Sequence, residues 1–243
     1  MRDYSFKPGL TASLIAMTVL PLFISLGVWQ LHRADEKTNL IELQQQRMQD
    51  EPLILDAEQR SLDDIRYRRV VVSGEYDVDH QFLLDNQVYQ QNPGYHVLTP
   101  LRIKGSDTAV LVNRGWVPMG ASRAELPDVR IRQPSVRITG MVDRFPRVGL
   151  KLEGAEIPSA GWPAVVQLVD PARIGERLGY PVLPYQVLAD DTAAEAYTRA
   201  WKETRLDPGK NLGYALQWFL FAAVALVLYV RHGIKAGTKA VVS

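Results

Sequence analysis

The chain has 243 residues, a formal net charge of +1 and no cysteine. This length suits one sizeable domain with short appendages, and the near-neutral charge gives no electrostatic footprint for nucleic acid. Without cysteine, disulfides, thiolate metal sites and cysteine nucleophiles are excluded.

The first predicted element is a transmembrane helix over residues 10–31. No charged residue occurs between Lys7 and His32, and at about 1.5 Å per residue the run spans roughly 30 Å. The alternative is a cleaved signal peptide. That reading is disfavoured because a signal h-region has only ~7–15 residues and this run lacks a small-residue cleavage site. The sequence therefore predicts an uncleaved anchor after a short tail, residues 1–9.

The predicted domain lies between residues 32 and 210. Asp35 to Gln49 is rich in helix formers, which predicts that the first helix continues beyond the apolar run. Short β-branched and aromatic runs follow, separated by Gly, Pro, Asn and Asp. They predict strands at Tyr67–Tyr76, Gln81–Tyr89, Tyr95–Ile103, Ala109–Val117, Val136–Asp143, Ala164–Val169 and Tyr185–Ala189.

Breaks at residues 92–94 and 104–107 fit hairpin connections, so we expect an antiparallel sheet closed into a small barrel or sandwich. Two short helices are expected within it. One is Pro171–Leu178, capped by Asp170, and the other is Thr192–Trp201.

A second transmembrane helix is predicted over residues 211–230, whose apolar run has no polar face and so argues against a buried core helix. Basic residues flank both runs on the terminal side: Arg2, Lys7, Arg231, Lys235 and Lys239. The positive-inside bias then places both tails, residues 1–9 and 231–243, in the cytoplasm and the domain on the opposite face. The expected fold class is a membrane-anchored α+β chain, with two transmembrane helices flanking one antiparallel β-rich domain.

Catalytic motifs are absent from the sequence, including the nucleophile elbow, the phosphate loop and the zinc-binding histidine pair. We therefore expect no enzyme activity. The adjacent carboxylates near predicted turns are read as solvated turn formers, and none of the four histidines has the spacing of a metal pair. These carboxylates are Asp63, Asp64, Asp77, Asp79, Asp190 and Asp191.

Polar and aromatic residues at the rim of the two apolar runs form the candidate binding site. A bilayer penalises such groups unless they face a partner or ligand. Packed together, they would make one amphipathic cluster suited to a planar amphipathic ligand or to another membrane protein, although plain hydrogen bonding between the helices is an equal alternative. The residues are Trp29, Gln30, His32, Arg33, Tyr214, Gln217 and Trp218.

Four segments, in this order, resemble the Surfeit locus protein one family, the assembly factors of haem–copper cytochrome c oxidase. Residues 27–37 (GVWQLHRADEK) resemble G-x-W-Q-x-x-R-x-x-x-K, and residues 92–101 (NPGYHVLTPL) resemble P-G-Y-x-V-x-T-P-L. Residues 112–118 (VNRGWVP) are similar to V-N-R-G-W-V-P, and residues 212–219 (LGYALQWF) are similar to the start of the family's second span. Occurring in this order within the same two-span architecture, they make a match that extends over nearly the whole chain.

The resemblance implies a non-enzymatic factor that helps to deliver or insert haem a into the large catalytic subunit of the oxidase. It also implies that this subunit and haem a synthase are partners, and that the membrane is the bacterial inner membrane, or the mitochondrial inner membrane in a eukaryote. A scaffold that holds an oxidase intermediate without binding haem is the second hypothesis, and an unrecognised envelope enzyme is the third.

Two positions of the resemblance carry further expectations. The family's haem-linked histidine of the second span is replaced by Asn211, and His32 at similar depth is a candidate substitute ligand. In the third motif we expect Arg114, Gly115 and Trp116 to shape a turn at the end of a strand, with a positive φ angle at Gly115 and Trp116 packed. Arg114 is expected either to pair with a nearby carboxylate or to contact a partner.

Overall fold

The structure is a computed structural model that describes residues 6–58, 60–146, 153–191, 193, 195–201 and 206–240, with side chains of the last helix described as far as Ile234. The chain divides into two compact units. A helical unit is formed by residues 1–43 and 204–243, and a sheet unit by residues 44–203.

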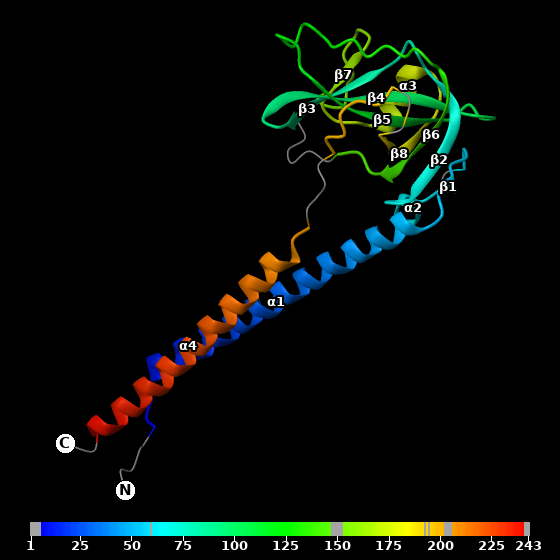
Figure 1. Cartoon of the computed structure of the whole chain (residues 1–243). Coiled ribbons are helices and arrows are strands. Elements are labelled where there is room, and N and C mark those ends of the chain that lie inside the picture. The colour runs from blue at the N-terminus through cyan, green and yellow to red at the C-terminus, as the bar shows by residue number, and fades with distance from the viewer. Residues whose placement is uncertain are drawn as a thin grey trace. The chain divides into compact units, whose positions relative to one another are not determined.

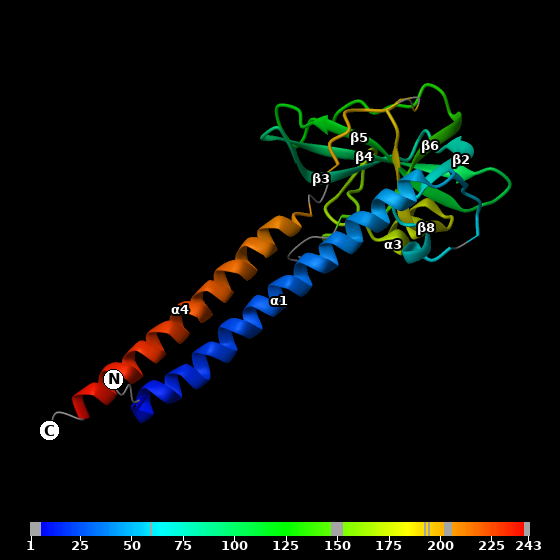
Figure 2. The same ribbon diagram turned by 60° about the horizontal axis from the view of Figure 1, so that its bottom comes forward.

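The helical unit contains α4 (Pro208–Ala240) and, as far as Leu43, α1 (Leu10–Gln49), and the two helices lie side by side (Figures 1 and 2). Both are long and apolar enough to cross a membrane, and only 11% of the apolar window of each is buried. Neither is therefore the core helix of a globular domain. The predicted continuation of the first helix to Gln49 is confirmed, and the second helix begins slightly earlier than predicted, at Pro208.

The described residues of the sheet unit contain all seven predicted strands and one more, together with two short helices, α2 (Leu62–Ile65) and α3 (Pro171–Leu178). The strands are β1 (Leu53–Ile54), β2 (Arg69–Tyr76), β3 (Phe82–Tyr89), β4 (Asn92–Ile103), β5 (Ala109–Pro118), β6 (Ser135–Asp143), β7 (Ala164–Val166) and β8 (Val182–Ala189).

The eight strands form one mixed sheet in the order β1-β2-β6-β8-β5-β4-β3-β7, with a further pairing of β2 with β4. Because β2 pairs with β4 as well as with β6, the strands β2, β6, β8, β5 and β4 form a closed ring. A purely antiparallel sheet was the wrong expectation, because β1–β2, β3–β7 and β5–β8 are parallel. Parallel neighbours need a long connection, and the chain between β5 and β8 supplies one that includes β6, β7 and α3.

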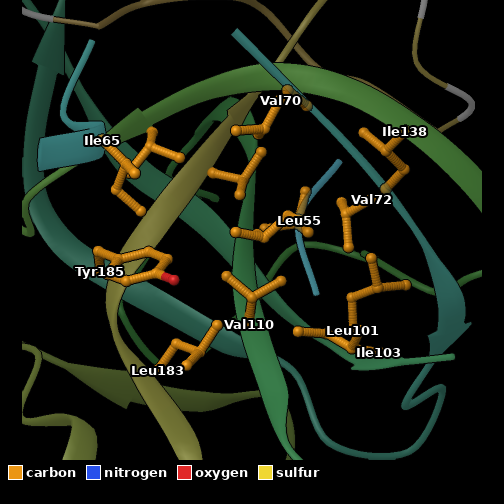
Figure 3. Packing of buried hydrophobic residues seen from close by; sticks show 14 of the residues in the cluster. Leu55, Ile65, Val70, Val72, Leu101, Ile103, Val110, Ile138, Leu183 and Tyr185 are labelled. Carbon is orange, nitrogen blue, oxygen red and sulfur yellow. The ribbon is translucent and has the colours of Figure 1, made fainter. Parts of the chain in front are cut away.

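The main core is built from alternate residues of these strands, whose branched side chains meet as Figure 3 shows. Val70 and Val72 of β2 and Val110 of β5 are fully buried. Because successive strand residues point to opposite faces, the residues between them on β2 face outward. The β-branched runs that predicted these strands are therefore the residues that fill the core.

One predicted helix and one predicted turn are wrong. The described residues of Thr192–Trp201 are not helical, and Thr198 instead forms an isolated bridge with Trp116 of β5. The β3–β4 turn lies at Gln90 and Gln91, which have φ angles of 48° and 65°, and residues 92–94 already belong to β4. The helix α3 has its predicted bounds, and the Asp170 side chain caps it by accepting hydrogen bonds from two backbone amides.

Candidate functional site

Small residues allow α1 and α4 to pack closely along a seam. Gly27 and Ala34 of α1 and Ala215 and Ala222 of α4 are buried. A Cβ atom placed on Gly27 would lie 2.6 Å from the ring of Phe219. The first glycine of the family-like segment in α1 is therefore a packing position, as small residues often are where helices meet.

A layer of hydrogen-bonded polar side chains lies in the same seam. The amide nitrogen of Asn211 donates to the side-chain oxygen of Gln30 at 2.6 Å, and the oxygen of Asn211 accepts from the ammonium of Lys37, also at 2.6 Å. The ammonium of Lys37 also lies 3.4 Å from the backbone oxygen of Asp207. Both ends of the Asn211 amide are thus engaged by α1, at the position where the family resemblance implies a histidine.

An aromatic layer follows further along the pair. Phe23 of α1 lies against Trp218 and Phe221 of α4, with ring centroids 5.6 and 5.8 Å apart. Near the opposite end of the pair, the hydroxyls of Ser13 and Tyr229 are 3.0 Å apart. Residues with higher numbers in α1 thus contact residues with lower numbers in α4, so the two helices are antiparallel.

Four of the seven predicted site residues lie on one side of the helix pair. Successive residues of a helix are rotated by about 100° around its axis. Measured from the seam residues of each helix, Trp29 and Arg33 of α1 are rotated in the same direction as Tyr214 and Trp218 of α4. In an antiparallel pair, equal senses of displacement face the same side. We call Trp29, Arg33, Tyr214 and Trp218 the aromatic flank. Trp29 and Tyr214 are 54% and 55% exposed, so its surface is open.

The other three predicted residues are placed differently. Gln30 lies in the seam, bonded to Asn211. His32 is exposed on the side of α1 that faces away from α4, and Gln217 is exposed beyond the edge of the flank. The predicted cluster is therefore divided, and the structure does not bring His32 and Asn211 together.

The aromatic flank fits only part of a haem. Its rings could stack on a planar macrocycle, and the guanidinium of Arg33, which pairs with Glu36 in this structure, suits a carboxylate. Haem iron is ordinarily held by His, Met, Cys or Tyr. Among the residues described here, the flank carries one such side chain, the phenol of Tyr214, and no imidazole. The donor set consequently departs from the histidine that the family resemblance implies.

In the sheet unit, the second and third family-like segments are neighbouring strands. They form most of β4 and β5, with His96 opposite Trp116 and Leu98 opposite Asn113. Between these two pairs β5 contains one extra residue, Arg114, so the segment forms a bulge inside the strand. The predicted turn at a strand end is therefore wrong, whereas the predicted positive φ angle at Gly115 is confirmed, at 125°.

The bulge turns the side chain of Arg114 into the interior, where it is fully buried. Its guanidinium donates to the backbone oxygens of Glu195 at 2.9 Å and Val129 at 3.0 Å, and lies 3.7 Å from the Glu195 carboxylate. Burial lowers the pKa of Arg114 from its ordinary value, while nearby Tyr197, Tyr76 and Glu195 oppose that change. Of the two predicted roles for Arg114, the structure shows the local pairing.

The same bulge holds the segment that follows β8. The backbone nitrogen of Tyr197 donates to the oxygen of Arg114 at 2.6 Å, and that of Trp116 donates to Thr198 at 2.7 Å. A Cβ atom on Gly115 would lie 2.7 Å from the backbone of Tyr197. Glycine is thus required both by its φ angle and by the close approach. Trp116 is packed as predicted, and its indole nitrogen donates to Gln87.

A further cluster escaped prediction because its carboxylate was read as a solvated turn former. The side chain of Asp77 is only 10% exposed. It accepts hydrogen bonds from the Tyr180 hydroxyl at 2.6 Å and pairs with His80 at 2.8 Å. Burial opposes ionisation of Asp77, but the hydrogen bonds from Tyr180 and His80 outweigh it and lower its pKa. The distance in sequence between Asp77 and Tyr180 left no local signal.

Metal binding finds no support among the described residues, where no group of three or more histidine and acidic side chains is arranged to hold an ion. His96 is buried in β4, edge-on to Trp201.

Comparison with known proteins matches residues 17–223 to the SURF1 family. A SURF1-like protein of Monosiga brevicollis is 24% identical over 252 residues, covering 95% of this chain and 90% of the relative. An uncharacterised SURF1-like protein of Mycobacterium bovis is 27% identical over 240 residues, covering 91% and 82%. A SURF1-like protein of Caenorhabditis briggsae is 32% identical over 126 residues, and that match spans 43% of this chain and 40% of the nematode protein.

The family match begins within α1, includes the paired strands β4 and β5, and ends within α4. It thus contains the seam, the aromatic flank and the Arg114 bulge. This chain belongs to the SURF1 family.

Proposed function

We propose that this protein is an assembly factor for haem–copper cytochrome c oxidase, which assists delivery or insertion of haem a into the large catalytic subunit. The observation that carries the proposal is the family match over residues 17–223, which begins within α1, includes the whole sheet unit and ends within α4. In this proposal the protein acts by binding, not by catalysis.

The proposed location follows from the two helices. With 27 or more residues each and little internal burial, α1 and α4 are suited to cross a membrane. We propose the bacterial inner membrane, or the mitochondrial inner membrane in a eukaryote, with both tails on the cytoplasmic or matrix side. Reporter fusions at Ser243 and within the loop at residues 120–130 should then report opposite sides. Both reporters on one side would contradict the two-span topology.

Within the proposed function, the aromatic flank is the surface for a planar amphiphile. Trp29, Tyr214 and Trp218 would contact its rings, and Arg33 would pair with its carboxylates. Haem a, when bound, would supply the redox centre of the oxidase after transfer. The large catalytic subunit and haem a synthase are the proposed partners on either side of that transfer.

A second candidate function is a scaffold that holds an oxidase intermediate without binding haem. The observation that favours it is the Asn211 amide, which is hydrogen-bonded to Gln30 and Lys37 where the family resemblance implies a haem-linked histidine. An amide so engaged is not a ligand for iron.

A deletion strain tests the proposed function. Loss of the gene should lower oxidase activity and the haem a occupancy of the large subunit, and unchanged values of both would overturn the assembly role. Haem a titrated into the wild type, His32→Ala and Asn211→His then separates the two candidates. Binding by the wild type favours delivery, whereas a low-spin Soret spectrum in Asn211→His alone favours the scaffold. Equal binding by His32→Ala and the wild type would exclude His32 as the ligand.

A further inference from the structure

A groove of about 770 Å³ lies on the outer face of the sheet unit where β2 meets β4 and β6. Ser73 and Glu75 of β2 alternate with the buried Val72 and Tyr76, so they point outward. Arg102 of β4 is also exposed. The groove is therefore on the solvent side of the same strands whose inner faces build the main core.

The register of the strands places cationic groups on both sides of the β2 residues. Ser73 is opposite Arg137 of β6, and its backbone oxygen accepts from the amide of Lys104 at 2.9 Å. Two residues further along β2, Glu75 is opposite Arg102 of β4 and Ser135 of β6. The lining thus contains three cations and one carboxylate, which leaves a local charge of 3 − 1 = +2.

These three cations have no carboxylate partner among the residues that the structure describes. Arg102 lies over the ring of Tyr180 at 4.2 Å instead. Most other arginines that the structure describes in the sheet unit are paired with a carboxylate. The paired arginines include Arg60, Arg66, Arg69, Arg123, Arg130 and Arg173.

We propose that this groove binds a phosphate group. A phosphate oxyanion accepts several charge-assisted hydrogen bonds at once, which matches two guanidinium groups and an ammonium. The hydroxyls of Ser73 and Ser135 line the same groove and add neutral donors. The phosphate can belong to an anionic lipid headgroup or to a soluble molecule, and both present the same chemistry to these residues. The inference is independent of the proposed role in oxidase assembly.

The binding experiment uses the full chain in an uncharged detergent, with two probes titrated separately: inorganic phosphate and monomeric dihexanoyl phosphatidylglycerol. Dihexanoyl phosphatidylcholine is the zwitterionic control lipid. Binding is measured by isothermal titration calorimetry at increasing salt, and the affinity should fall as salt rises because the contacts are ionic. Preference for phosphatidylglycerol over phosphate assigns the site to a lipid headgroup, and the reverse assigns it to a soluble phosphate.

Two triple variants make the test specific to the groove. Arg102→Gln, Lys104→Gln and Arg137→Gln together should weaken binding about tenfold or more, because all three charged donors of the groove are lost. The matched control carries Arg130→Gln, Arg132→Gln and Arg173→Gln, which removes the same charge outside the groove and should leave affinity nearly unchanged.

The single variant Glu75→Gln should tighten binding, because it removes the one carboxylate of the lining. All substituted residues are exposed, so the unfolding temperature and near-ultraviolet circular dichroism should match the wild type. If the groove triple and the control triple bind both probes equally, or if the wild type binds neither probe, the phosphate site does not exist.

Discussion

The side-chain nitrogen of Asn211 and the side-chain oxygen of Gln30 are 2.6 Å apart across the seam of α1 and α4. In the family-like sequence, Gln30 is a motif residue and Asn211 is the departure. The departure is thus accommodated by the motif itself, since Gln30 and Lys37 satisfy both ends of the new amide.

This pair should be energetically coupled. We expect a double-mutant cycle of Gln30→Leu and Asn211→Leu to give a coupling energy on the order of 0.6 to 1.7 kcal/mol, as hydrogen bonds between membrane helices do. The measurement is unfolding of the full chain in mixed micelles. Gln217→Leu is the control, because Gln217 is exposed, and should change stability little. Additive single-variant effects would show that the hydrogen bond contributes no stability.

Close packing at Gly27 gives a second prediction. Gly27→Val should separate α1 from α4, because its Cβ would lie within 3 Å of the Phe219 ring. Gly213→Val in α4 is the matched control, since nothing lies within 4 Å of a Cβ there. We expect lower protein abundance in membranes for the first variant only. Equal abundance of the two would mean that the seam tolerates the larger side chain.

For Arg114 the buried contacts predict a structural role. Arg114→Met should destabilise the sheet unit by about 3–5 kcal/mol, because it leaves the buried acceptors at Val129 and Glu195 unpaired. Glu195→Gln should cost less than about 1 kcal/mol, because that carboxylate is partly exposed. In cells, abundance of the Arg114 variant and oxidase assembly should fall together. Lost assembly at normal abundance would instead indicate contact with a partner.

Gly115 and Gly105 form a second matched pair of glycines, because both have positive φ angles but only Gly115 is crowded. Gly105→Ala should cost about 1 kcal/mol from backbone strain alone. Gly115→Ala should cost clearly more and should also release residues 197–198 from β5. Thermal unfolding measures the first effect and hydrogen exchange at the Trp116 amide the second. Similar costs for both variants would contradict the crowding argument.

Acid should weaken the sheet unit through Asp77. Its pKa is lower in the folded protein than in the unfolded chain, so its hydrogen bonds add stability above the ordinary aspartate pKa, and that stability is lost as pH falls through the lowered value. Asp77→Asn should therefore be less stable than the wild type near neutral pH, and the difference should shrink below about pH 4. Denaturant unfolding across this range provides the test, and a difference that stays constant with pH would contradict it.

The strands and α3 were predictable because their signals are local. Short runs of β-branched residues marked β2 and β5, and Asp170 followed by Pro171 marked the start of α3. The parallel pairing of β5 with β8 was not predictable, since register between distant strands has no local pattern. The segment 192–201 was misread because helix-forming residues there are held by backbone hydrogen bonds to β5 instead.

The sequence named the candidate residues of the two helices but could not place those of one helix against those of the other. Helical spacing predicted that Gln30 and Arg33 share a face of the first helix, whereas in the structure Gln30 lies in the seam, bonded to Asn211, and Arg33 lies on the aromatic flank. The contact between Lys37 and Asn211 depends on how the two helices are aligned along their length. Sequence spacing within each helix does not give that alignment.

The parallel pairing of β5 with β8 has a consequence for biosynthesis. Ala109 pairs with Val182, so a ribosome must release almost the entire domain before β5 obtains its second neighbour. Until then, β5 presents an unsatisfied strand edge rich in apolar side chains, the kind of intermediate that aggregates. During synthesis the nascent domain should therefore need protection from aggregation until β8 has emerged and paired with β5.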